Sequence, residues 1–215
     1  MSVVDENPFS LALVPEPPDN GSKIRILNLL RGLAPHHEVT LPSFSDQPEA
    51  SREAAQIRSL CSEIHIVPWR EFDPHSLRAK LGFLRFQPRW LTDTFSPEMA
   101  QQISQRLDGG EYDLIIASQL PMAAYHPYFN DVPAIFDELE LGLSGEDLRG
   151  AMGWLLRLRR RFTWFKFHFY LSRLLKHIRA VSVLSDEERE LVARYFPRVK
   201  KRSFPTAWMW MGTQA

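Results

Sequence analysis

The segment Phe9–Arg25, FSLALVPEPPDNGSKIR, decides how the rest of the chain is interpreted. Its first six residues, Phe9–Val14, form a short apolar run of strand length, and the three prolines that follow exclude both strand and helix. Asp19–Gly21 then form a turn, Ser22 can cap a helix, and a helical repeat of Ile and Leu runs to Leu33. A strand that leads through a glycine-bearing loop to a helix N-terminus is typical of nucleotide-binding α/β domains, because the free N–H groups of that helix favour an anion.

This loop alone leaves two alternatives open. It has one glycine, so the patterns GxGxxG and GxxxxGK[ST] are both absent, and an oxidoreductase that uses a nicotinamide or flavin cofactor loses support. The remaining alternatives are an anion-binding loop and an ordinary strand–turn–helix joint. The choice between these two depends on the other segments of the chain.

Composition restricts the class of protein. The formal net charge is zero over 215 residues, so no overall field points to nucleic acid, and we expect no nucleic-acid partner. The single cysteine, Cys61, excludes an internal disulfide framework and makes a Cys/His zinc site unsupported, so we expect no metal. No apolar stretch reaches the length of a membrane span, and the acidic N-terminus does not resemble a signal peptide. These features predict a cytoplasmic protein.

Strands alternate with helices along the whole chain. Apolar runs predict strands at Phe9–Val14, Glu38–Phe44, Glu63–Val67, Tyr112–Ser118, Val132–Leu139 and Ala180–Leu184. Helices are expected at Ile24–Leu33, Pro48–Leu60, Pro97–Leu107, from Pro121, through the run after Gly153 to Ala180, and from Ser185 to Phe196, with broken helices over Phe72–Arg89. The alternation predicts one doubly wound, Rossmann-like α/β domain of about six parallel strands, with its ligand outside their carboxyl ends.

Several polar residues fall at those carboxyl ends. Asp137 and Glu138 end the fifth predicted strand, where a carboxylate can orient a hydroxyl or accept its proton. Acids at strand ends are also common as caps, so both interpretations stay open. Ser118 and Ser185 end two other strands, and we expect each to cap a helix; Glu188 completes a capping box with Ser185.

A long basic helix is predicted after Gly153. It contains Arg157, Arg159, Arg160, Arg161 and Lys166 among seven aromatic residues and no acid. Cations interleaved with aromatic side chains suit a helix that lies at an anionic membrane surface. The alternatives are a core helix whose arginines extend into solvent and a nucleic-acid contact, which the balanced charge elsewhere disfavours.

Four stretches together resemble the N-terminal, acceptor-side domain of GT-B glycosyltransferases of the family 4 (group 1) type. They are PPDNGSKIR at Pro17–Arg25, the helix-and-strand sequence LNLLRGLAPHHEVTL, EYDLIIAS at Glu111–Ser118, and AVSVLSDEERELVARYFP at Ala180–Pro197. The resemblance implies a retaining enzyme of two domains, in which a nucleotide-sugar is the donor substrate, a lipid or polysaccharide is the acceptor, and neither cofactor nor metal is needed. Together with the basic helix, this leads us to expect work at the cytoplasmic, inner face of the membrane.

The resemblance further implies roles for individual residues. Asn20, Gly21 and Ser22 would approach the donor diphosphate through their backbone amides, and Arg25, one helical turn later, would face the same cleft. Asp137 and Glu138 would lie close to the transferred sugar. Relatives often have a second glycine in the loop and a histidine near the strand end; this chain has Ser22 and no histidine there.

The last residues differ from what the resemblance predicts. We expect a domain over residues 1–202 and a non-native tail over 203–215, because the codons of Trp208–Met211, TGGATGTGGATG, encode Asp-Val-Asp when read one base upstream. The shifted frame permits VPNGVDVD, the continuation expected before a donor domain. A fragment that lacks this domain is expected to be inactive alone. The alternative is a non-catalytic Rossmann-like module that binds a ligand or a partner.

Overall fold

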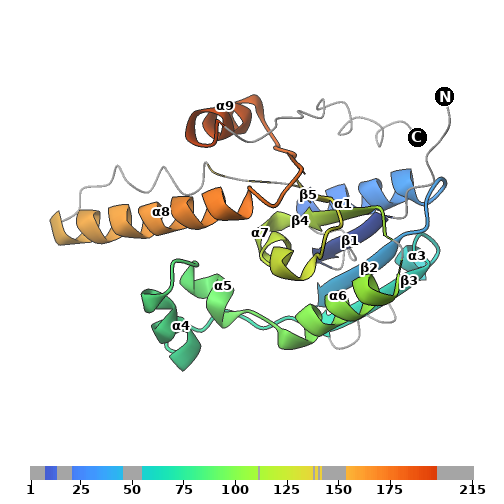
Figure 1. Cartoon of the computed structure of the whole chain (residues 1–215), viewed down its shortest axis with the longest axis horizontal. Coiled ribbons are helices and arrows are strands. Elements are labelled where there is room, and N and C mark those ends of the chain that lie inside the picture. The colour runs from blue at the N-terminus through green and yellow to red at the C-terminus, as the bar shows by residue number, and fades with distance from the viewer. Residues whose placement is uncertain are drawn as a thin grey trace.

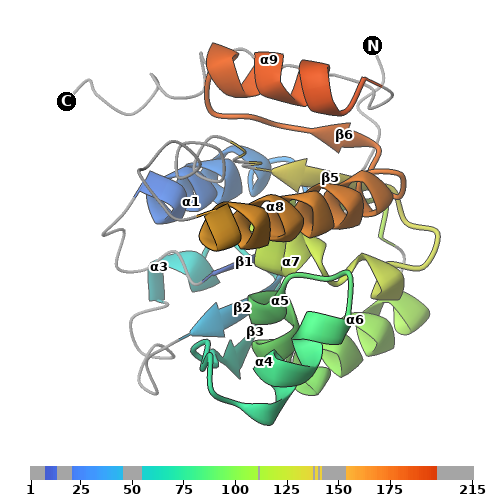
Figure 2. The same ribbon diagram turned by 90° about the vertical axis from the view of Figure 1, so that its left-hand side faces the viewer.

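A computed structural model describes residues 8–13, 21–45, 55–110, 112–137, 139, 141 and 154–197 of the chain, and it describes no side chains for residues 8–13, 55, 56, 155, 156, 159 and 160. The strands pair in the order β3-β2-β1-β4-β5-β6, and every pair is parallel. Figure 2 shows this order, with β3 at one end and β6 at the other. The prediction of an α/β fold with parallel strands is therefore confirmed.

The strands lie close to their predicted positions. Their bounds are β1 Pro8–Leu13, β2 Thr40–Ser45, β3 Glu63–Pro68, β4 Leu114–Ser118, β5 Ala134–Asp137 and β6 Ala180–Val181. Strand β4 is buried almost throughout, as its uninterrupted apolar sequence predicts for a central parallel strand. Strand β6 is only two residues long, so it ends three residues earlier than predicted, and Ser182 lies directly after it.

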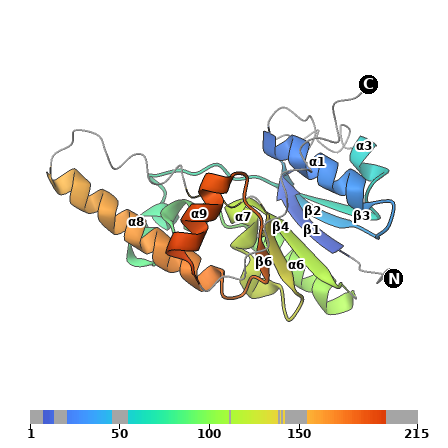
Figure 3. The same ribbon diagram turned by 90° about the horizontal axis from the view of Figure 1, so that it is seen from above.

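Helices cover both faces of the sheet (Figure 3). Helix α1 (Gly21–Leu33) and helix α3 (Ala55–Arg58) pack on one face around the buried side chains Ile26, Leu30, Leu41 and Ile57. Helix α6 (Pro97–Gly109) and helix α7 (Gln119–Ala123) pack on the other face in a larger cluster that includes Met99, Ile103, Met122 and Phe136. Apolar side chains alternate between these two clusters along β2 and β3, which is the period of an extended strand.

Two helices begin with capping serines, and the cap at Ser185 agrees with the prediction from the sequence. The Ser96 hydroxyl accepts a hydrogen bond from the Met99 amide at 3.3 Å, and Pro97 occupies the first turn of α6. The Ser185 hydroxyl accepts from the Glu188 amide at 3.1 Å and begins helix α9 (Asp186–Tyr195). Of the predicted helix Pro48–Leu60, residues 48–54 lie outside the described part, and α3 ends at Arg58, two residues before the predicted end.

The segment 72–93 forms a helical insertion beside the sheet (Figure 1). It consists of helix α4 (Leu77–Leu81), a 3₁₀ helix (Gly82–Leu84) and helix α5 (Arg89–Asp93), which agrees with the broken helices expected there. Its polar centre is Asp93, whose side chain is fully buried. The Asp93 carboxylate accepts hydrogen bonds from the Ser76 hydroxyl and, at 2.9 Å, from the Asp73 amide.

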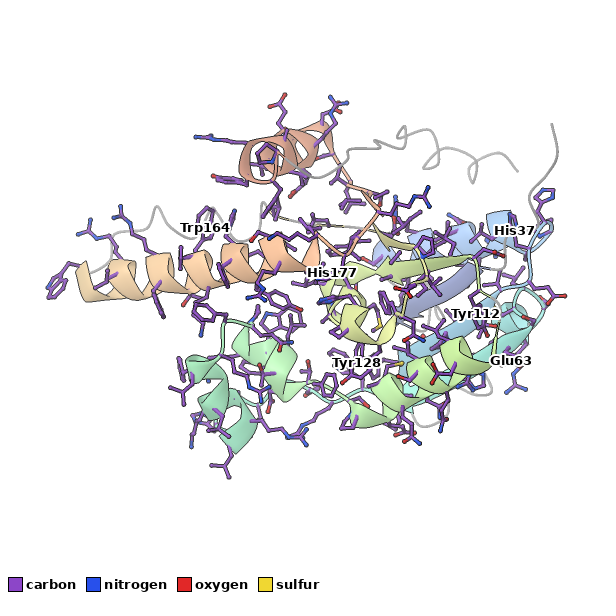
Figure 4. The ribbon with its side chains drawn as sticks, viewed as in Figure 1. His37, Glu63, Tyr112, Tyr128, Trp164 and His177 are labelled. Carbon is purple, nitrogen blue, oxygen red and sulfur yellow. The ribbon has the colours of Figure 1, made fainter. Side chains whose placement is uncertain are left out.

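The basic helix α8 (Trp154–Leu174) projects beyond the sheet, as Figure 1 shows. Its C-terminal end is anchored by the buried residues Leu171 and Leu174, with Leu175 directly after. One turn before these residues, His168 lies against Trp164 of the same helix. It also contacts Tyr195 and Phe196, at the end of α9, so that α9 packs on α8. Figure 4 shows Trp164 on the side of α8 that faces α9. Burial lowers the pKa of the His168 imidazole, so the ring in this aromatic contact stays neutral at pH 7.

Candidate functional site

The candidate site lies at the carboxyl edge of the sheet, between β1 and β4. Strand order reverses at this point, since β2 and β3 lie on one side of β1, and β4, β5 and β6 on the other. Ligands of open α/β sheets bind in the crevice outside such a switch point. Helix α1 begins beyond the end of β1 and helix α7 directly after β4, so two helix N-termini meet the same edge.

At this edge, an ion pair connects Arg25 of helix α1 with Asp137 at the end of β5. The Arg25 guanidinium donates from Nε to Asp137 Oδ2 at 3.0 Å and from Nη2 to Asp137 Oδ1 at 2.7 Å. Arg25 Nη2 also donates to the Ser182 hydroxyl at 3.1 Å, and that hydroxyl donates to Asp137 Oδ1. The side chain of Asp137 is 8% exposed and that of Arg25 is 32% exposed. A two-point contact of this kind fixes the orientation of the carboxylate and also stabilises its negative charge.

Backbone contacts hold two of the partners, Asp137 and Ser182, in place. Asp137 is the last residue of β5, paired in register with Ser118 of β4. The Ser182 amide donates to the Phe136 carbonyl at 2.9 Å, and the Ser182 carbonyl accepts from the Leu139 amide at 3.1 Å. The sheet thus positions the two groups that accept hydrogen bonds from Arg25.

The end of β4 carries two unusual features. The Ser118 side chain is 1% exposed, and its hydroxyl has no hydrogen-bond partner within the described part of the chain. The next residue, Gln119, has φ of 67°, a left-handed conformation that costs free energy for a residue with a Cβ atom. Strained residues of this kind collect at ligand sites, so Ser118 and Gln119 belong to the candidate site.

The structure places some of the predicted diphosphate-loop residues and leaves others outside the described part. Helix α1 begins at Gly21, so Ser22 lies in its first turn and the prediction that Ser22 caps the helix is wrong. Gly21 has no positive φ, and a Cβ atom there would have nothing within 4 Å. Asn20 and Glu138 lie outside the described residues, as does the tail 203–215.

The predicted membrane-surface cations of α8 have different surroundings. Arg157 and Arg161 are exposed, whereas the side chains of Arg159 and Arg160 lie outside the description. The Lys166 ammonium donates to the carbonyls of Phe83 at 2.9 Å and Gly82 at 3.4 Å, so it is directed toward the insertion. No helix in the described part of the chain is long and apolar enough to cross a membrane.

Sequence reasoning missed Ser182 and Gln119. The polar residue Ser182 interrupts the apolar run that predicts a strand to Leu184, and this interruption marks the end of the strand. No local pattern marks the conformation of Gln119. Among the described residues, no group of three or more His, Cys, Asp or Glu is placed to hold a metal ion.

Comparison with solved structures identifies the architecture. A UDP-glucosyltransferase from Polygonum tinctorium, capable of glucosylating indoxyl, matches with a TM-score of 0.53 and 14% identity over 95% of this chain and 52% of that chain. Phytolacca americana UGT2, complexed with UDP-2-fluoro-glucose and pterostilbene, matches with a TM-score of 0.51 and 10% identity over 95% of this chain and 54% of that chain. The fold is that of GT-B glycosyltransferases.

The similarity is one of structure. At 10% and 14% identity it shows the fold alone, and the chain spans about half the length of these solved structures. No family model matches the sequence, and no curated protein matches it. The GT-B part of the predicted resemblance is therefore confirmed at the level of fold, while the assignment to family 4 stays a prediction.

Proposed function

We propose that this chain supplies the acceptor-side half of a GT-B glycosyltransferase, which transfers a sugar from a nucleotide-sugar to a lipid or polysaccharide acceptor. One observation carries the proposal: the N-terminus of α1, the strained end of β4 and the Arg25–Asp137 ion pair occupy the carboxyl edge at the switch point of a GT-B-like domain. That edge is where an α/β sheet of this order binds a nucleotide or its partner substrate.

The proposed roles follow from the contacts at this edge. The first amides of α1, at Gly21 and Ser22 and with Asn20 before them, approach the donor diphosphate, because helix N–H groups without an intrahelical partner favour an anion. Asp137 Oδ2 receives one hydrogen bond, from Arg25, and keeps acceptor capacity for an acceptor hydroxyl. Arg25 acts by positioning Asp137, and Glu138, the next residue, is the second candidate to accept a proton.

The donor-binding half is proposed to lie outside this sequence, so the chain alone transfers no sugar. The test compares nucleotide-sugar turnover by the purified chain with turnover by a protein extended through the downstream reading frame. We expect turnover from the extended protein only. Turnover by the chain alone, or a downstream frame that encodes no second α/β domain, would contradict the proposal and favour a stand-alone binding module.

A second proposal concerns location. The exposed cations Arg157 and Arg161 lie on an acid-free helix that projects from the domain, and we propose that α8 rests on an anionic membrane at its cytoplasmic face. Vesicle co-sedimentation with Arg159–Arg161 replaced by glutamate tests this. Equal binding by the variant and the original chain would remove the role.

A further inference from the structure

Two segments far apart in the sequence carry most of the exposed apolar side chains. Thirteen large apolar residues are exposed in the described part of the chain; six belong to residues 72–86 and five to α8. In the insertion they are Phe72, Leu77, Leu81, Phe83, Leu84 and Phe86. Leu84 is 86% exposed and Leu77 is 78% exposed, which leaves their side chains almost wholly in contact with solvent.

The five residues of α8 form one stripe. Trp154, Leu158, Phe162, Phe165 and Phe169 follow one another at intervals of three or four residues, so they share one side of the helix. The buried residues Leu171 and Leu174 lie on the opposite side, which packs against the domain. The stripe is therefore additional to the surface that anchors α8.

The two segments touch. The rings of Phe86 and Phe169 lie 4.9 Å apart, and Lys166 Nζ donates to the Phe83 carbonyl at 2.9 Å. Figures 1 and 2 both show α4 and α5 beside α8. The exposed apolar residues of the insertion and the stripe of α8 thus form one surface, which we call the docking surface.

The charge around the docking surface is mainly positive. The exposed acids Glu71 and Asp73 flank Phe72 at its edge, whereas neither residues 74–92 nor α8 contains an Asp or Glu. Exposed cations lie in both parts, at Arg78, Lys80, Arg85, Arg157, Arg161 and Arg173. Apolar side chains flanked by cations match an interface of acyl chains and anionic headgroups.

A lipid surface suits this geometry better than a protein does. The most exposed side chains, Leu77, Leu84 and Trp154, project from separate helical elements. A fluid bilayer adapts to such projections, whereas a protein partner needs a complementary shape packed like a protein interior.

We propose that residues 72–86 of the insertion form a second membrane-binding element, which inserts its Leu and Phe side chains into an anionic bilayer together with the stripe of α8. The inference rests on the proposed membrane location and is independent of the transferase activity. Contact through two elements fixes the orientation of the domain, whereas a single helix can roll about its axis.

Site-specific fluorescence tests the proposal in the full chain. The chain has one native thiol, Cys61, that could also take the fluorophore. Burial raises the pKa of this thiol to about 11, and a Cys61→Ala background removes the thiol altogether. An environment-sensitive fluorophore is attached at Leu84→Cys in the insertion, at Leu158→Cys in the stripe, or at Asn28→Cys, an exposed control on α1. Each protein is mixed with phosphatidylcholine vesicles that contain or lack phosphatidylglycerol.

We expect a blue shift and a several-fold rise in emission at positions 84 and 158 with the anionic vesicles, and none at position 28. A response at 158 without one at 84 would overturn the role of the insertion. Equal responses with neutral vesicles would overturn the charge argument. A response that grows with protein concentration in the absence of vesicles would show that a second copy of the chain covers the surface.

Discussion

At the scale of single residues, the ion pair between Arg25 and Asp137 dominates the candidate site. Both carboxylate oxygens accept hydrogen bonds from one guanidinium, and the carboxylate is almost buried. Such a pair adds little net stability when intact, but removal of one partner leaves a charge without compensation. The pair is thus a structural requirement as well as a proposed functional one.

Replacing Arg25 by alanine is expected to destabilise the chain by about 2 kcal/mol, less than the ~3–5 kcal/mol of a fully buried pair, because the arginine is partly exposed. Urea unfolding measures this. Asp137→Asn removes the charge and keeps the shape, so the double variant should be more stable than the sum of the two single changes predicts. Additive changes would show that the two side chains do not interact.

Gly21 offers a separate test of the proposed diphosphate loop. A Cβ atom at Gly21 meets nothing within 4 Å, so Gly21→Ala should leave the free energy of unfolding unchanged or raise it by about 0.5 kcal/mol. Loss of nucleotide-sugar affinity in the extended protein would then report close approach of the ligand. Gly110→Ala is the contrasting variant, because its Cβ atom would lie 2.5 Å from the Tyr112 ring. A destabilised Gly21→Ala variant would contradict this account.

At the scale of elements, the insertion 72–93 depends on one buried carboxylate. Burial by itself would raise the pKa of Asp93. The hydrogen bonds from the Ser76 hydroxyl and the Asp73 amide outweigh this effect, together with Arg70 at 3.9 Å. They hold the pKa of Asp93 below its ordinary value. The ionised form is therefore the one that the folded insertion favours.

A carboxylate with a lowered pKa stabilises the fold above its ordinary pKa of about 4, and this contribution disappears as the pH falls through the lower folded value. We expect the protection factors of the amides in 72–93, which compare exchange with its intrinsic rate at each pH, to fall over that acidic range in the original chain. Asp93→Asn should show low protection factors already at pH 7 and lose this pH dependence. Glu71→Gln, an exposed change nearby, serves as the control. Unchanged exchange in Asp93→Asn would remove the role of the carboxylate.

At the scale of the whole molecule, the core lies on the two faces of the sheet and includes the C-terminal end of α8, but not its exposed stripe. Phe136 of β5 is fully buried in the larger cluster, whereas Phe165 of α8 is 57% exposed. Two phenylalanines of the same chain therefore contribute very differently to stability, although the sequence around each is similarly apolar.

Phe136→Ala is expected to cost about 3–5 kcal/mol, since it removes a packed ring and leaves a cavity. Phe165→Ala should change the free energy of unfolding by no more than about 0.5 kcal/mol. Chemical denaturation of the two variants measures both values. A large loss for Phe165→Ala would place the stripe of α8 in the core and would remove the docking surface.

Local pattern was enough to place the strands, the cap at Ser185 and the basic helix, because apolar periodicity and capping chemistry act over a few neighbouring residues. It also selected Asp137 as a candidate from its position at the end of a strand, whereas Arg25 was selected by the family resemblance. It missed Ser182, since the shortness of β6 depends on its pairing with β5.

The pairing of Arg25 with Asp137, 112 residues away, and the contact between α8 and the insertion follow only from packing in three dimensions. A guanidinium or ammonium group binds whichever acceptor the folded chain brings within reach. Lys166, expected at a membrane surface, thus donates to the carbonyls of the insertion.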